Sequence, residues 1–166
     1  NFYWSLSSPE VGSLVSGRRF DISDSRDFTS TPAMYAPAGD YRLTVYANGT
    51  TTGGYGFRLA DIFSGNSYLP GTLQEGSIDP GNNTELFVFD ASVGDRFFFD
   101  SLTTTGDGEW KIIDPLGQLV TTSTYHRNDV GPFTLQHDGQ YAILFEGRDS
   151  QTTPYNYKFN LHPVVD

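Results

Sequence analysis

One turn of the sequence gathers oxygen-bearing side chains of the kind that bind calcium. Asp79, Asn82, Asn83 and Glu85 lie together in the segment IDPGNNTEL. Calcium takes about six to eight oxygen ligands from carboxylates, amides and carbonyls, so this turn could supply several of them. The turn does not match the loop pattern D-x-[DN]-x-[DN]-G, and Asp and Asn are also the residues that ordinary turns favour. The sequence leaves both interpretations open.

A second acidic loop lies near the start of the chain. Asp21, Asp24 and Asp27 recur at a spacing of three in the segment FDISDSRDF. Their carboxylates are hard ligands of the type that calcium prefers. This loop also lacks a calcium-loop motif, so a solvated polar loop is the competing interpretation.

Exposed aromatic side chains could bind sugars by offering flat apolar faces to the rings. The candidates are Trp4, Trp110 and Tyr125, with Tyr3 beside the first of them. Trp4 and Trp110 open two similar segments, and this repetition favours equivalent core positions. Tyr125 lies in the polar loop TSTYHRND, where an exposed ring is more readily expected.

The residues that could catalyse a reaction do not form a recognisable group. The chain has three histidines, His126, His137 and His162, and no cysteine. His126 is followed by Arg127 and Asp129, but neighbours in sequence are not a catalytic triad. The sequence has neither G-x-S-x-G nor H-E-x-x-H, and nothing selects a pair of carboxylates for glycoside hydrolysis. We therefore predict that the chain is not an enzyme.

The elements that must position these residues are predicted to be strands. Segments such as YRLTVYA, TELFVFDAS and DRFFFDSL alternate apolar and polar residues or are rich in aromatic and β-branched ones. Runs of this kind, bounded by Gly, Pro, Asn and Asp, indicate β-strands. Turn residues recur between them at short intervals. The sequence therefore predicts an all-β chain folded as a sandwich or a barrel.

The same order of features occurs twice along the chain. WSLSSPEVGSLV begins at Trp4, and WKIIDPLGQLV begins at Trp110. Further on, APAGDYRLTVYA and QHDGQYAILFEG align Tyr41 with Tyr141. Both copies end in alternating apolar residues: Tyr55, Phe57 and Leu59 match Tyr157, Phe159 and Leu161. Self-similarity of this kind is the signature of a repeat protein.

The two copies differ in how much of the repeat they contain. Residues 71–166 hold a complete repeat, because the segment before Trp110 supplies its front half. That front half has no counterpart before Trp4, so residues 1–62 are predicted to be the back half of a repeat. Residues 63–70 are expected to be a joint. Half a sandwich exposes an inner face and strand edges, which another copy of the chain or a neighbouring repeat could cover.

Composition and charge narrow the classes of partner. The formal net charge is -10, which argues against binding to nucleic acid because phosphates would repel the chain. No apolar run reaches the roughly 18 residues that cross a bilayer, so insertion into a membrane is not expected. The 13 Phe, 10 Tyr and 2 Trp supply enough aromatic surface for a folded core.

The pattern of strands and turns resembles a known bacterial family. GSIDPGNNTELFVFDASVGDRFFFDSL, then WKIIDPLGQLV, HDGQYAILFEG and YNYKFNL, is similar to pre-peptidase C-terminal domains and to related repeats of large secreted or cell-surface proteins. The resemblance implies a small antiparallel β-sandwich of jelly-roll type that lies outside the cell and has no catalysis of its own. Family members attached to peptidases bind insoluble substrates, and some bind calcium. The turn around Asn82 carries fewer acidic residues than the family pattern, which weakens the implied calcium site.

Taken together, these features predict a non-catalytic extracellular or cell-surface module of a larger protein. It would act as a structural or adhesive repeat, stabilised by calcium and able to associate with itself. The alternative is a carbohydrate-binding module attached to a secreted hydrolase, with polysaccharide as its partner. A row of exposed, coplanar aromatic rings would distinguish the second possibility from the first.

Overall fold

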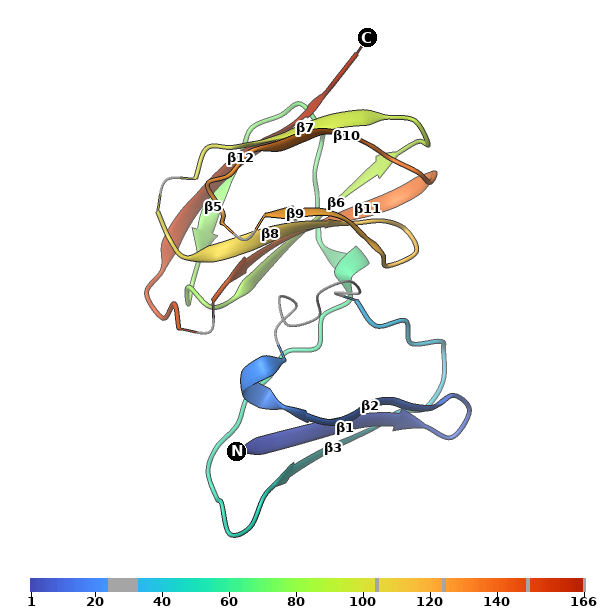
Figure 1. Cartoon of the computed structure of the whole chain (residues 1–166), viewed down its shortest axis with the longest axis vertical. Helices are drawn as coiled ribbons and strands as arrows, with labels where there is room; N and C mark the ends of the chain where they lie inside the picture. The colour runs from blue at the N-terminus through green and yellow to red at the C-terminus, as the bar shows by residue number, and fades with distance from the viewer. Residues whose placement is uncertain (24–32, 104, 124, 149, 166) are drawn as a thin grey trace. The chain divides into compact units, whose positions relative to one another are not determined.

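The computed structural model of the chain describes residues 1–23, 33–103, 105–123, 125–148 and 150–165. Contacts divide the chain into two compact units, which we call the N-terminal unit (Asn1–Leu59) and the sandwich unit (Ala60–Asp166). Both units are built from strands (Figure 1). Among the described residues, no helix is long and apolar enough to cross a bilayer. The prediction of an all-β chain is confirmed.

The sandwich unit consists of two sheets that lie face to face (Figure 1). One sheet has the order β10-β7-β12-β5, with β5 Gln74–Ile78, β7 Arg96–Ser101, β10 Val130–Thr134 and β12 Tyr155–Pro163. The other has the order β4-β6-β11-β8-β9, with β4 Asn66–Ser67, β6 Thr84–Ala91, β8 Gly108–Ile113, β9 Leu119–Ser123 and β11 Gly139–Gly147. The β4–β6 pair is parallel, and the other pairs between these strands are antiparallel.

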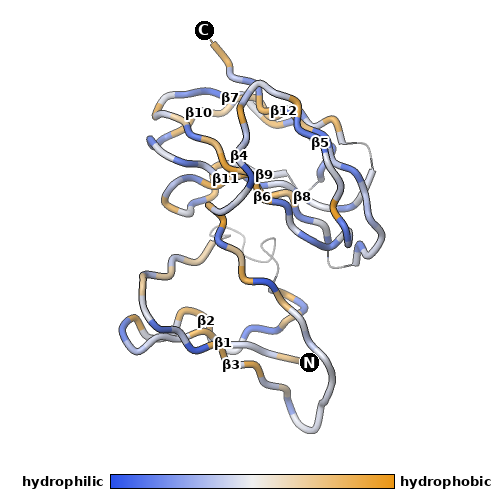
Figure 2. The backbone as a smooth tube through the Cα atoms, turned by 180° about the vertical axis from the view of Figure 1, so that it is seen from behind, coloured by the Kyte–Doolittle hydropathy of each residue, from blue (hydrophilic) through white to orange (hydrophobic). Residues whose placement is uncertain are grey.

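Aromatic rings from the facing sheets fill the core of the sandwich. Phe99 and Trp110 stack with ring centroids 3.8 Å apart, and Phe145 and Phe159 stack at 4.8 Å. All four side chains are fully buried. Such pairs contribute about 0.5–1.5 kcal/mol each beyond the burial of their area. Hydrophobic and hydrophilic stretches alternate along the chain of the sandwich unit (Figure 2).

The segment 63–70 is part of the sandwich and not a free joint. Its strand β4 pairs with β6, and the ring of Tyr68 is buried in the core. The hydroxyl of Tyr68 donates to the carbonyl of Thr72 at 2.8 Å and accepts from the amide of Leu161 at 2.9 Å. The 3-10 turn η3 (Ile62–Ser64) packs against the outer face of the β6–β11–β8 sheet. These contacts correct the expectation that residues 63–70 only connect two units.

The N-terminal unit contains one three-stranded antiparallel sheet with the order β2-β1-β3. Its strands are β1 Phe2–Ser8, β2 Gly12–Arg19 and β3 Arg42–Ala47, and the 3-10 turn η1 Phe20–Ile22 follows β2. One face carries Phe2, Trp4 and Leu6, paired with Ala47, Val45 and Leu43. The opposite face carries Tyr3 and Tyr46, whose rings stack at 5.6 Å.

This small sheet reproduces half of a sheet of the sandwich. The order β2-β1-β3 corresponds to β9-β8-β11, and each pairing is antiparallel in both units. The register also agrees, because Trp4 lies opposite Val45 as Trp110 lies opposite Phe145. Leu6 and Leu43 are paired in the same way as Ile112 and Ile143. The predicted fold, one complete repeat preceded by half a repeat, is confirmed.

One segment of the half repeat does not form the strand that its sequence matches. Residues 51–61 correspond to β12 but contain no strand, whereas most of the counterpart of β10 lies outside the described residues. In the sandwich, β12 pairs with β5 and β7, and β10 pairs with β7. The N-terminal unit has no counterpart of β5 or β7 among its described residues. Strands therefore form where the pairing partner lies within the same half.

Candidate functional site

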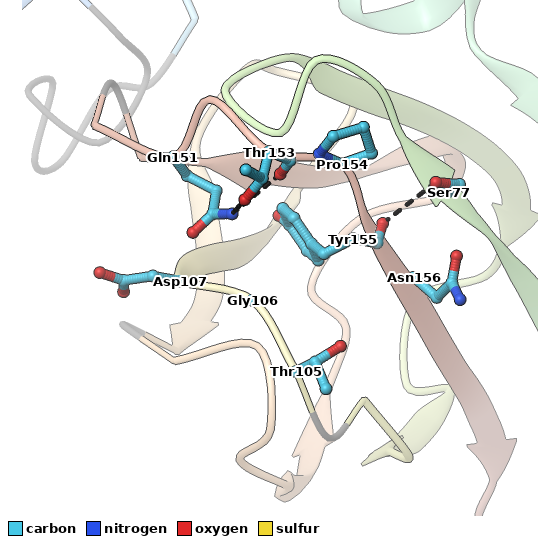
Figure 3. A pocket seen from close by; sticks show the side chains of 9 residues that line it. All are labelled: Ser77, Thr105, Gly106, Asp107, Gln151, Thr153, Pro154, Tyr155 and Asn156. Atoms are coloured by element: carbon cyan, nitrogen blue, oxygen red, sulfur yellow. Dashed lines mark hydrogen bonds between the residues drawn. The ribbon is translucent and has the colours of Figure 1, made fainter.

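Three connections of the sandwich unit form two adjoining hollows. The connections join β7 to β8, β9 to β10 and β11 to β12. The hollows have volumes of about 470 Å³ and about 320 Å³, and both are lined by Thr105, Gly106 and Asp107. In the larger hollow, the ring of Tyr155 lies between the 151–154 loop and Gly106 (Figure 3). We treat these adjoining hollows as the candidate site because an aromatic ring and charged side chains line them.

The ring of Tyr155 forms the floor of the larger hollow. Its hydroxyl is buried and has no hydrogen-bond partner within the described residues. Burial, with smaller contributions from the negative charges of Asp107 and Glu146, raises the pKa of Tyr155. Gly106 has a φ of +89°, and a Cβ there would lie 2.2 Å from Cδ2 of the ring. The loop can pass over the ring because residue 106 is a glycine.

His126 lies beneath the smaller hollow and is only 2% exposed. Its Nε2 is 2.7 Å from the carbonyl oxygen of Glu109, which can only accept, so Nε2 carries the proton. The ring contacts those of Phe145 and Tyr155, with centroids 5.2 and 5.3 Å away. Burial lowers the pKa of His126 to about 4, because it disfavours the charged form. His126 is therefore neutral near pH 7 and serves as a core residue.

The rim of the smaller hollow carries charges of both signs. Arg148 Nε donates to Asp107 Oδ1 at 3.0 Å, and the guanidinium of Arg127 lies 5.3 Å from the centroid of the Tyr125 ring. Tyr125 is 46% exposed, which agrees with its predicted place in an open loop. This rim could bind a small polar molecule through one aromatic face and hydrogen bonds. Asp107 lies in the β7–β8 connection, and Arg148 and Tyr155 lie at the two ends of the β11–β12 connection, so no spacing in the sequence identifies them.

The carboxylates of the sandwich do not present the pair that glycoside hydrolysis needs. Glu109 and Glu146 are buried on one face of the β11–β8 pair, and Lys111 lies with them. Lys111 Nζ is 2.5 Å from Glu109 Oε1 and 3.9 Å from Glu146 Oε2. A buried ammonium group between two carboxylates offsets their charge. We interpret this trio as structural.

The turn predicted to bind calcium holds its residues through hydrogen bonds within the protein. The side-chain amide of Asn83 donates to the carbonyl of Asp79 at 3.2 Å, and the carbonyl of Asn83 accepts from the amide of Gly147 at 3.1 Å. Asn82 is exposed, and Glu85 lies in β6 opposite Phe145. These bonds are those of an ordinary turn at the end of a hairpin. Calcium binding there stays a prediction of the sequence.

The second acidic loop is described only in part. Asp21 forms an ion pair with Arg19, and this hydrogen bond lowers the pKa of its carboxyl. Asp24 and Asp27 lie outside the described residues. Across the described parts of the chain, no three His, Cys, Asp or Glu side chains lie close enough together to hold a metal ion.

The aromatic residues predicted to bind sugars occupy different environments. Trp110 is fully buried, and its indole nitrogen donates to the carbonyl of Asn128 at 3.3 Å. Trp110 therefore cannot stack on a sugar, because the core of the sandwich covers both faces of its ring. Trp4 is partly buried, and its indole nitrogen donates to Ser23 Oγ at 2.8 Å. Of the three, Tyr125 alone presents an open ring.

The remaining histidines are separate from the hollows. His137 Nε2 lies 3.6 Å from Asp114 Oδ2, and His162 Nε2 lies 3.3 Å from Asp100 Oδ2. Both side chains are partly exposed at the surface. The structure does not bring His126, His137 and His162 together.

Comparisons with known proteins reveal a similarity of fold. No family model and no curated protein matches the sequence. The pre-peptidase C-terminal domain of a collagenase from Bacillus anthracis superposes with a TM-score of 0.50 at 17% identity, covering 64% of this chain and 99% of that domain.

Periplasmic inhibitors of g-type lysozyme also superpose on the chain, with lower scores. PliG of Salmonella Typhimurium gives a TM-score of 0.41 at 12% identity, covering 59% of this chain and 96% of that protein. PliG of Aeromonas hydrophila gives 0.42 at 14% identity, covering 55% and 85%. The collagenase domain is the match that agrees with the resemblance seen in the sequence. The sandwich of this chain therefore has the fold of a bacterial pre-peptidase C-terminal domain.

Proposed function

We propose that the chain is a non-catalytic structural repeat of a larger bacterial protein, acting outside the cytoplasm as a spacer or adhesive segment. The observation that carries this proposal is the repeat itself. The sheet β2-β1-β3 and the strands β9-β8-β11 share their order, direction and register. Repetition of one folding unit extends a chain by a fixed step, which is a mechanical property and needs no active site.

One further feature supports a location outside the cytoplasm, because the sandwich has the fold of a domain of a bacterial collagenase. The net charge of -10 bears on solubility. A high net charge keeps neighbouring modules soluble and apart, which suits a protein with many copies of one domain.

Small-angle X-ray scattering of tandem fusions tests the spacer function. One, two and three copies of the chain are joined end to end, and the maximum dimension of each is measured. A spacer predicts a constant increase in length with each added copy. Fusions that fold back into a compact body, with no regular increase, would contradict the proposal.

A carbohydrate-binding module is the second candidate, and the exposed ring of Tyr125 favours it. Tyr125 is 46% exposed, lines the smaller hollow and has Arg127 beside it. One aromatic face and a few polar groups suit weak binding to one sugar unit. Retention of the chain on insoluble polysaccharides, compared with that of Tyr125→Ala, measures this activity. Equal retention of the two proteins would rule out Tyr125 as a sugar-binding residue.

A further inference from the structure

The sheet of the N-terminal unit has an apolar face and an unpaired edge. The face carries Leu6, Leu43 and Val45, of which Leu6 is buried, Val45 is partly buried and Leu43 is 39% exposed. The segment that follows β3 adds Phe57 and Leu59, which are 54% and 67% exposed. Within the described residues, β3 has β1 on one side and no strand on the other. This surface resembles the inner face of one sheet of a sandwich without the facing sheet.

The complete repeat shows what covers the same surface. The edge of β11, which corresponds to β3, pairs with β6, so that Tyr141 and Ile143 lie opposite Phe89 and Phe87. The inner face of β11 packs against the sheet that contains β5, β7 and β12. The counterparts of the exposed residues, Ile143, Phe159 and Leu161, are all fully buried there.

The absence of a strand in residues 51–61 has the same cause as the unpaired edge of β3. In the sandwich, β12 lies between β5 and β7 and is hydrogen-bonded to both. Residues 51–61 repeat the sequence pattern of β12 but have no such neighbours, and they form no strand. Instead, Tyr55 packs against Phe2 and Phe20, with centroids 5.9 and 5.7 Å apart. A strand needs a partner for its backbone groups, so one absent segment accounts for both the open edge and the absent strand.

We propose that the N-terminal unit is the acceptor for a front-half segment with the pattern of residues 62–106. Its strand equivalent to β6 pairs antiparallel with β3 and places two aromatic residues opposite Tyr41 and Leu43. Its strands equivalent to β5 and β7 enclose residues 55–59, which then form the strand equivalent to β12. This inference assigns a partner to one surface and does not rest on the spacer function.

A second copy of the chain fits this surface less well. It could donate its own residues 62–106 only by opening its sandwich, which would expose Phe99, Phe159 and the rest of the buried core. Such an exchange gives no net gain in buried apolar surface, because one closed sandwich would replace another. The partner is therefore an additional front-half segment.

The residue at position 47 limits which front-half segments can bind to the N-terminal unit. A Cβ on Gly147 would lie 1.5 Å from the carbonyl oxygen of Gly81, so the β5–β6 turn passes directly over this residue. The corresponding residue in the N-terminal unit is Ala47, paired with Phe2 as Gly147 is paired with Gly108. The natural partner must therefore have a β5–β6 turn that differs from that of residues 79–83.

A grafted chain tests the proposal. Residues 62–106 are duplicated and joined directly before Asn1, because the alignment of Trp4 with Trp110 makes Asn1 equivalent to residue 107. A second graft carries Ala47→Gly, which removes the methyl group that meets the β5–β6 turn. Hydrogen exchange of residues 54–61 is compared in both grafts and in the chain itself. We expect at least about a hundredfold slower exchange in one graft or both, because a paired strand must open before it exchanges.

Two controls decide between the outcomes. A graft whose copies of Phe87 and Phe99 are replaced by Ser should leave residues 54–61 unprotected. In the protected graft, Leu43→Ala should lower the melting temperature, and in the chain itself it should not. Unprotected residues 54–61 in both grafts would overturn the proposal. Protection of these residues in the ungrafted chain, with the mass of a dimer, would also overturn it and would make a second copy the partner.

Discussion

A single buried histidine makes the stability of the sandwich depend on pH. His126 has a pKa of about 4 in the folded chain and an ordinary value of 6.5 when unfolded. Below pH 6.5 the unfolded state binds the proton first, so stability decreases as the pH falls and is lowest below about pH 4. At about 1.4 kcal/mol per pKa unit, the decrease amounts to about 3 kcal/mol. Urea unfolding between about pH 7 and pH 4 measures it.

The variant His126→Phe separates this effect from the titration of the carboxylates. Phenylalanine keeps a ring between Phe145 and Tyr155 but cannot bind a proton. The variant is expected to be less stable at neutral pH, because the carbonyl of Glu109 loses its donor. Its stability should then change less with pH than that of the parent chain. Parallel pH profiles for the two proteins would show that His126 does not remain neutral in the fold.

The glycine at the end of β11 supports a second prediction at the residue scale. A Cβ at Gly147 would overlap the backbone of Gly81, and backbone atoms in a tight turn cannot move aside as a flexible side chain can. Gly147→Ala is therefore expected to destabilise the sandwich by about 2 kcal/mol or more. The matched variant Ala47→Gly, at the corresponding residue of the N-terminal unit, should leave the stability of the sandwich unchanged. Urea midpoints that shift equally in both variants would contradict this explanation.

Among the elements, the strands whose pairing partners lie nearby could be predicted from the sequence. The alternation around Trp4, Tyr41, Trp110 and Tyr141 predicts β1, β3, β8 and β11, and the repeat predicts that they pair alike. The alternation of residues 55–59 is as clear, yet they form no strand. Their pairing would need strands from another part of a repeat, and periodicity does not reveal whether a partner is present.

The candidate site shows the same limit of sequence analysis. Asp107 lies near Arg148 and Tyr155 only because the β7–β8 and β11–β12 connections converge, so no local motif marks them. The polar loop around Tyr125 predicts an exposed ring. Trp110 is by residue type a candidate for sugar binding, but its place in the repeat favours the core. Position within a repeat was therefore a better guide to burial than residue type.

Equivalent aromatic residues in the two copies should differ in their contribution to stability. Phe159 in β12 is fully buried, and its counterpart Phe57 is 54% exposed. Phe159→Ala is expected to cost about 3–5 kcal/mol of unfolding free energy, because it leaves a cavity in the core. Phe57→Ala should cost less than about 1 kcal/mol, as exposed positions do. Chemical denaturation of both variants measures the difference, and equal losses would mean that Phe57 is buried in solution.

At the scale of the whole molecule, the two units are expected to unfold separately. The sandwich closes two sheets over an aromatic core, whereas the N-terminal unit buries one face of a three-stranded sheet only in part. Small sheets with little buried area are marginally stable. The N-terminal unit should therefore unfold at a lower urea concentration. The chain reports both events, because Trp4 lies in one unit and Trp110 in the other.

Tryptophan fluorescence during urea unfolding should accordingly show two transitions. In Trp4→Phe the first transition should disappear, since Trp110 alone remains and reports the sandwich. The second transition should keep its midpoint, because residues of the N-terminal unit do not contribute to the aromatic core of the sandwich. A front-half segment grafted before Asn1 should move the first transition toward the second, because a closed core then replaces an open face. A single transition that Trp4→Phe leaves unchanged would mean that the two units form one cooperative body.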